Sequence, residues 1–191
     1  MGEKLHRFIT RTSLNDIVDV EKHDNIADEI CFQVKEILIA TGSRLSPSTV
    51  ALMISELVDN FAQHSKRNLA ALALQYYPQP GNLMIAVGDC GIGIRRSLAS
   101  NRKHAWLKEK PHYIAALEAL KPGVSRKPQG GTGFTDVLDG VADLGGELRL
   151  ATGDEYISVE KGQANYGAMN FDLPGVQLEI SLPGRISAWN A

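Results

Sequence analysis

Apolar residues recur every three or four positions in two stretches near the start of the chain, and this spacing predicts two amphipathic helices. The first stretch covers 21–42 and ends at Gly42, a residue type that commonly terminates helices. The second covers 46–65, where Ser46 is the expected N-cap and Pro47 the first helical residue. The N-terminal third of the chain is therefore predicted to be mainly helical.

Beyond these helices the apolar pattern becomes alternating, which is typical of strands. Segments 70–77 and 83–88 are predicted to form a hairpin around a Pro/Gly turn, and 5–11 is predicted to be a short strand. Further helices are expected at 111–120 and directly after the glycine-rich loop that opens 130–146.

The C-terminal part is predicted to be rich in strands, in the segments ELRLAT, EYISVE, NYGAMNFDL and VQLEISLP. This order of elements favours the α+β class: a two-layer α/β sandwich with one mixed β-sheet and helices on one face. A length of 191 residues fits a single domain, 1–191. Within it, 1–45 is an N-terminal strand and helix segment, and 94–130 is expected to be irregular around one helix.

Composition is that of an ordinary globular protein, because 43% of the residues are hydrophobic and 22% are charged. No apolar run approaches the roughly 20 residues that span a bilayer, and the first residues lack the apolar core of a signal peptide. We therefore expect a cytoplasmic protein with no membrane partner. Cys31 and Cys90 are too few for a disulfide framework and are expected to be reduced thiols in packed sites.

Charge is distributed unevenly along the chain. Segment 94–130 holds nine lysine or arginine residues and two glutamates, a net charge of +7, so the remainder carries −9 in a chain of net charge −2. Such a segment indicates either an anionic ligand or a solvated, charged loop. A nucleic-acid interface using Trp106 and Tyr113 is a third reading, which the acidic balance of the whole chain disfavours.

Polar residues interrupt the second helix along one edge of its apolar stripe. Glu56, Asn60 and His64 follow each other at spacings of four and form one ridge, whereas Asp59 and Gln63 are expected to point to solvent. A carboxylate one turn from an amide oxygen can hold a hard cation or activate a nucleophile. The alternative is a network of polar groups that simply satisfy one another at the rim of the core.

A second polar feature stands at the end of the strand predicted at 83–88. Asp89 can accept a hydrogen bond from an exocyclic amine, and Gly91 and Gly93 allow the backbone to approach a flat ligand. The stretch is not a dinucleotide-binding fingerprint, because Arg96 occupies the place of its third glycine. A simple glycine-rich turn is the alternative.

A third feature is the loop Gly131-Thr132-Gly133, which precedes a predicted helix. Free N–H groups and the positive end of a helix dipole suit a phosphate group, although a hinge before the helix is the alternative. Taken together with the basic segment, the three features fit one ligand: a metal-bound nucleoside triphosphate.

In this order the motifs resemble those of the Bergerat-fold (GHKL) ATP-binding superfamily, which includes gyrase, ninety-kilodalton heat-shock chaperones, sensor histidine kinases and mismatch-repair proteins. Glu56-Leu57-Val58-Asp59-Asn60 resembles its N box. Asp89-Cys90-Gly91-Ile92-Gly93 resembles its first glycine box, and Gly131-Thr132-Gly133-Phe134 its second. The resemblance covers about 46–183 and implies the Bergerat fold.

The resemblance also implies roles for individual residues. Asn60 would coordinate Mg²⁺, Asp89 would bind the adenine amine of ATP, and Gly91 and Gly93 would shape the adenine pocket. Segment 94–130 would be a mobile ATP lid. The residues that would contact the phosphates are Gly131, Thr132 and Gly133.

Glu56 matches the general base of those relatives that hydrolyse ATP or phosphorylate serine. The spacing from Asn60 to His64 is similar to that of anti-sigma-factor serine kinases, in which case His64 would reach a phosphate. Alternatively, His64 is a satisfied histidine at the core edge. The resemblance to these kinases and to stand-alone bacterial ATPase-domain proteins implies a bacterial signalling switch with a regulatory protein partner. It leaves open whether the chain is an ATPase, a serine/threonine kinase or a switch without turnover, and whether it forms a homodimer.

One departure from the family pattern concerns the adenine site. Many members carry a threonine after a glycine in a late strand, where its hydroxyl supports the adenine-binding aspartate. Val176 occupies that place here, and Thr152 is a less convincing substitute. The sequence therefore predicts an adenine site that is weakened or supported by water.

Overall fold

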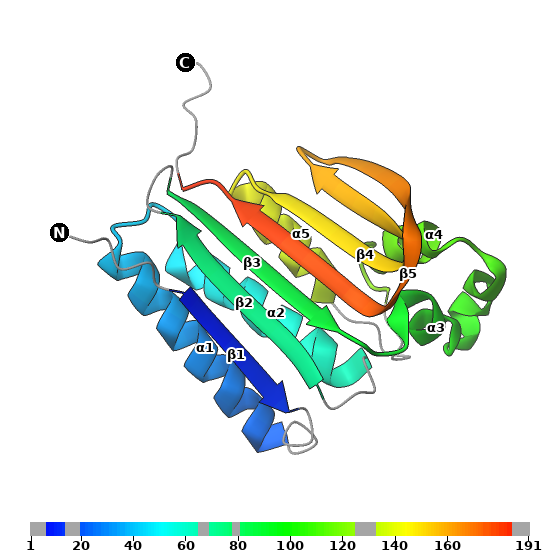
Figure 1. Cartoon of the computed structure of the whole chain (residues 1–191), viewed down its shortest axis with the longest axis horizontal. Coiled ribbons are helices and arrows are strands. Elements are labelled where there is room, and N and C mark those ends of the chain that lie inside the picture. Colours follow the sequence, from blue (N-terminus) through cyan, green and yellow to red (C-terminus); the bar gives the residue numbers. More distant parts are fainter. Residues whose placement is uncertain (1–6, 14–19, 65–68, 78–80, 125–132, 185–191) are drawn as a thin grey trace.

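The computed structural model describes residues 7–13, 20–64, 69–77, 81–124 and 133–184. In these ranges five strands form one sheet in the order β1-β2-β3-β5-β4 (Figure 1). The elements in chain order are β1 (Arg7–Ser13), α1 (Val20–Ala40), α2 (Pro47–His64), β2 (Leu69–Tyr77), β3 (Asn82–Asp89), α3 (Gly93–Ala99), the 3₁₀ helix η2 (Arg102–Glu109), α4 (His112–Ala119), α5 (Gly133–Asp143), β4 (Glu147–Glu160) and β5 (Gln163–Leu182).

The predicted helices and strands of the first ninety residues are confirmed in type, with boundaries that move by a few residues. Helix α2 begins at Pro47, as expected, and the Ser46 hydroxyl caps it by accepting a hydrogen bond from the Thr49 N–H at 3.3 Å. The hairpin of β2 and β3 is antiparallel, and Ala70 pairs with Asp89.

The prediction of a mixed sheet was wrong, because every strand pairing in the described ranges is antiparallel. Strands β3 and β4 run in the same direction, since both are antiparallel to β5. They are not neighbours, however, because β5 lies between them. The long connection from β3 to β4 therefore produces two antiparallel pairs in place of one parallel pair.

The two faces of the sheet differ, as the alternation in the sequence requires. Side chains on the inner face are buried beneath α1, α2 and α5, which lie together behind the sheet in Figure 1. This confirms an α+β sandwich with helices on one face. The outer face is open, and its strands carry many small side chains. The inner set includes Leu72, Leu74, Ile85, Val87, Leu148, Leu150, Leu178 and Ile180.

Segment 93–124 is a packed helical unit, not the irregular stretch that the sequence suggested. It consists of α3, η2 and α4, which bury Leu98, Leu107 and Ala115. A seven-residue helix and a 3₁₀ helix give too few repeats for a 3.6-residue period to stand out. Residues 125–132 lie outside the described ranges.

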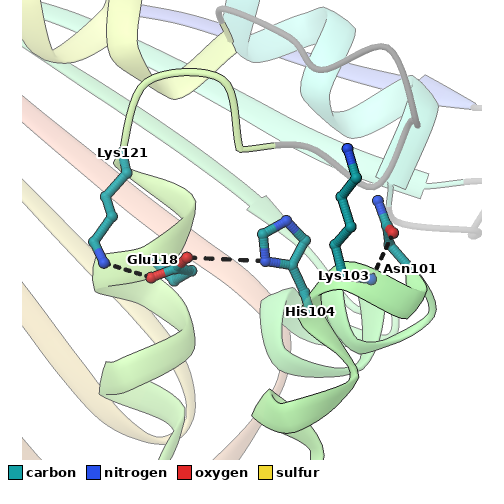
Figure 2. Close-up of polar contacts among 5 residues, drawn as sticks. All are labelled: Asn101, Lys103, His104, Glu118 and Lys121. Carbon is teal, nitrogen blue, oxygen red and sulfur yellow. Dashed lines mark hydrogen bonds and ion pairs between the residues drawn. The ribbon is translucent and has the colours of Figure 1, made fainter.

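Several polar groups of this unit lie close to one another. Figure 2 shows the Glu118 carboxylate of α4 between the Lys121 ammonium group, at 2.6 Å, and the His104 ring of η2, at 3.8 Å. The Arg95 side chain donates to the Lys110 carbonyl at 2.9 Å and so joins α3 to the end of η2. None of the described helices combines the length and apolar character needed to cross a membrane.

Candidate functional site

Asp89 is the last residue of β3 and continues the buried, inward-facing series of that strand. It is only 5% exposed. Its carboxylate accepts hydrogen bonds from the N–H groups of Gly91 and Val176. Burial raises the pKa of Asp89 above its ordinary value, and these two hydrogen bonds oppose the rise. An anchored carboxylate at the rim of the core can accept a further hydrogen bond from a ligand.

A bulge in β5 brings Val176 to this position. The pairing of β4 with β5 shifts register on both sides of Gly153, so β5 has extra residues opposite that point. Gly175 lies in the bulge with a φ of +81°, and a Cβ there would overlap the Asp89 oxygens and the Gly91 nitrogen. Only glycine fits such a close approach of two backbones.

Thr152 braces the same bulge from β4. Its buried hydroxyl donates to the Gly175 carbonyl at 2.8 Å. It also lies against Gly93, where a Cβ would come 3.0 Å from the Thr152 Oγ1 atom and where φ is +72°. Gly91 thus lies against the Asp89 carboxylate and Gly93 against Thr152, and their role in shaping an adenine pocket stays a prediction.

The prediction that Val176 leaves the adenine site weakened or supported by water stays a prediction. The residue contributes its main-chain N–H, which donates to the Asp89 carboxylate. Sequence reasoning missed Gly175, which lies in a Pro-Gly pair between two segments predicted as separate strands; where one strand runs through such a pair, as β5 does, the glycine is a signal for a bulge or a close backbone approach.

Glu56 and Asn60 lie on the edge of α2 and are both half-buried. Burial raises the pKa of Glu56, and the nearby charges of Asp136 and Asp59 raise it further. The Nδ2 atom of Asn60 is buried and has no hydrogen-bond partner in the structure as described. Asp59 is half-buried, so it is less open to solvent than predicted. The side chains of Gln63 and His64 lie outside what the structure describes.

Helix α5 approaches α2 closely, because Gly140 has no side chain. A Cβ at Gly140 would come 2.6 Å from the sulfur of Met53. One turn further along α2, Glu56 lies near Asp136 of α5. The two helices therefore run in opposite directions. The first residue of α5, Gly133, is thereby directed toward the turn of α2 that carries Asn60. Gly131 and Thr132 lie outside the described ranges, so their predicted phosphate contacts stay predictions.

These groups gather at one end of the fold. Helix α2 ends at His64, β2 begins at Leu69, and the next residue, Ala70, pairs with Asp89. Figure 1 shows that the end of α2, the end of β3 and the start of α5 all lie on the side of the molecule where α3 is found. The site therefore combines one anchored carboxylate, a glycine turn, a half-buried carboxylate, an amide and a helix N-terminus.

The two thiols differ in their surroundings. Cys31 is half-buried, with its Sγ atom 3.2 Å from the Ala51 carbonyl oxygen, and burial raises the pKa of this thiol. Cys90 is exposed, so the prediction of a packed thiol was wrong for it. Cys90 borders a groove of about 750 Å³ over the outer face of the sheet, together with Gly88 and Gln177.

Comparison with known protein families and with curated proteins found no match.

Proposed function

We propose that this chain is a Mg-ATP-binding module of the Bergerat type, which turns ATP over as part of a bacterial signalling switch in the cytoplasm. The arrangement around Asp89 carries the proposal. A buried carboxylate that is held by two main-chain N–H groups at a glycine turn suits an exocyclic amine, and adenine has such an amine. The α+β sandwich, with helices on one face of its sheet, is compatible with such a fold, whereas its all-antiparallel pairing departs from the mixed sheet that was expected.

The residues at the edge of α2 fit a magnesium ion bound together with the nucleotide. The buried nitrogen of the Asn60 amide has no hydrogen-bond partner among the described residues, so this side chain is not fully satisfied within the protein, and its oxygen is of a type that Mg²⁺ accepts. Mg²⁺ keeps several waters and takes phosphate oxygens with one or two protein ligands, so one amide is sufficient. When bound, the ion would neutralise developing charge on the phosphates.

Glu56 is the residue that we assign to proton transfer. Its raised pKa makes the carboxylate a better base than an ordinary glutamate. It accepts a proton from the attacking water, or from a serine or threonine hydroxyl, as the oxygen bonds to the γ-phosphorus and the bond to ADP breaks. Gly133 begins a helix whose positive end favours the phosphates.

Calorimetric titration of the parent and Asp89→Asn with Mg-ATP tests the proposal. We expect the parent to bind and Asp89→Asn to lose binding at least about tenfold, because an amide nitrogen replaces one of the acceptor oxygens. Release of phosphate by the same parent samples would support turnover. Binding without release would instead favour a switch in which ATP orders a surface for a regulatory partner. A folded parent that does not bind Mg-ATP would refute both.

A further inference from the structure

The Asp89 main-chain carbonyl faces β5 at the point where that strand bulges away. The bulge places Gly175 against this carbonyl, so the regular ladder between β3 and β5 ends one residue earlier, at the pair of Gly88 and Gln177. A buried carbonyl without a partner costs roughly 1–3 kcal/mol. The Gln177 side chain supplies the missing donor, since its Nε2 atom donates to the Asp89 carbonyl at 3.0 Å.

The glutamine reaches this carbonyl across Gly88, from the open face of the sheet. Gln177 alternates with the inward-facing Leu178 and therefore lies on the side opposite the Asp89 carboxylate. A Cβ at Gly88 would overlap the amide oxygen of Gln177 and come 2.8 Å from its Cδ atom. Gly88 thus leaves the space in which the amide lies.

We propose that Gln177 is a positioning residue for recognition of the base, and this inference rests on the function proposed above. Its hydrogen bond fixes the peptide plane between Asp89 and Cys90. That plane is one side of the short turn through Cys90 to Gly91, so fixing it helps to set where the Gly91 N–H lies relative to the carboxylate to which it donates. Gln177 therefore holds the acceptor in position from the far side of the sheet and does not touch the nucleotide itself.

The inference is tested with two nucleotides that differ at the group Asp89 reads. ATP carries a 6-amino group, and inosine triphosphate carries a 6-oxo group that cannot donate to a carboxylate. In Gln177→Met the side chain keeps its length and loses the donor. We expect the affinity for ATP to fall about tenfold, the affinity for inosine triphosphate to stay within about twofold, and the preference for ATP to shrink accordingly.

Two further variants separate positioning from general damage. Gln75→Met makes the same change on the same face of the sheet, but Gln75 pairs with Met84, far from Asp89, and both affinities should stay at parent values. Gly88→Ala displaces the Gln177 amide without altering it and should reproduce the loss for ATP. Both substitutions break the same hydrogen bond, that between Gln177 and the Asp89 carbonyl. The double variant should therefore bind ATP no more weakly than either single variant.

Thermal unfolding establishes that each variant is folded before it is titrated, and Gln177→Asn, whose amide is one methylene too short, replaces Gln177→Met if that variant fails to fold. An unchanged ratio of ATP to inosine triphosphate affinity in a folded variant overturns the positioning role and leaves the proposed function standing. An equal loss for both nucleotides also overturns it, because a merely structural glutamine would act on both. Failure of the parent to bind ATP refutes the proposed function and the inference together.

Discussion

The Thr152 hydroxyl donates a hydrogen bond to the Gly175 carbonyl at 2.8 Å, and this bond joins β4 to the bulge of β5. Both groups are buried, with Thr152 only 1% exposed. The bulge in turn places the Val176 N–H on the Asp89 carboxylate. A single hydroxyl on one strand therefore supports, through the backbone of the next, the residue that we assign to base recognition.

Replacing Thr152 by valine keeps the shape of the side chain and removes the donor. The Gly175 carbonyl would then lack its partner in a buried position, and we expect a loss of about 1–3 kcal/mol in the free energy of unfolding. Urea denaturation of the parent, Thr152→Val and Thr152→Ser measures this. The serine variant retains the hydroxyl and should be clearly more stable than the valine variant. Equal stability of the two would contradict the assigned bond.

Gly175 should tolerate no side chain. Alanine there is disfavoured by a φ of +81° and by overlap with the Asp89 oxygens, so we expect Gly175→Ala to lose both Mg-ATP binding and several kcal/mol of stability. Gly162 is a matched control, because it has a φ of +74° with no atom within 4 Å of an added Cβ. Gly162→Ala should cost only about 1 kcal/mol and leave binding intact. If both variants behave alike, the overlap at Gly175 is unimportant.

Sequence reasoning located the elements and residues whose signals are local. The end of β3 at Asp89 and the start of α2 at Pro47 each follow from neighbouring residues, and the structure has them there. Sequence reasoning could not locate contacts that depend on how strands distant in the sequence pair with one another. Support of Asp89 by Val176 requires the register shift of β4 against β5, and no local pattern encodes that register. The mixed-sheet prediction was wrong for the same reason.

The helical unit 93–124 is expected to contribute to the stability of the whole domain. Leu107 of η2 is fully buried, so Leu107→Ala should cost about 2–5 kcal/mol of unfolding free energy. Leu52 of α2 is 56% exposed, and Leu52→Ala should change stability by less than about 0.5 kcal/mol. Denaturant unfolding with fluorescence detection compares the two. A negligible effect at Leu107 would mean that this segment opens independently of the core, as the predicted lid would.

If Glu56 transfers the proton, Glu56→Gln should reduce phosphate release by at least about 100-fold while Mg-ATP still binds. Asp59→Asn, on the same helix, is the control for loss of a nearby charge and should retain most of the activity. Asp136 raises the pKa of Glu56, so Asp136→Asn should move the acid limb of the pH–rate profile to lower pH. Turnover by Glu56→Gln at the parent rate would remove Glu56 from the mechanism.

Glu56 should also leave a signature in stability against pH. Burial, followed by Asp136 and Asp59, raises its folded-state pKa above the ordinary value of 4.5, so the folded protein holds this proton more tightly than the unfolded chain. The resulting stabilisation is fully present below the ordinary value and is lost as the pH rises through the folded-state pKa. Glutamine imitates the protonated form at every pH. The free energy of unfolding of Glu56→Gln should therefore match that of the parent below pH 4.5 and exceed it near pH 7. The difference should be less than about 1 kcal/mol, because solvent screens a half-exposed group.

Unfolding free energies at several pH values test this, with Glu36→Gln at an exposed position of α1 as the control. A stability difference in favour of Glu56→Gln that grows as the pH falls would contradict this prediction. It would show that the folded state stabilises the Glu56 carboxylate and lowers its pKa.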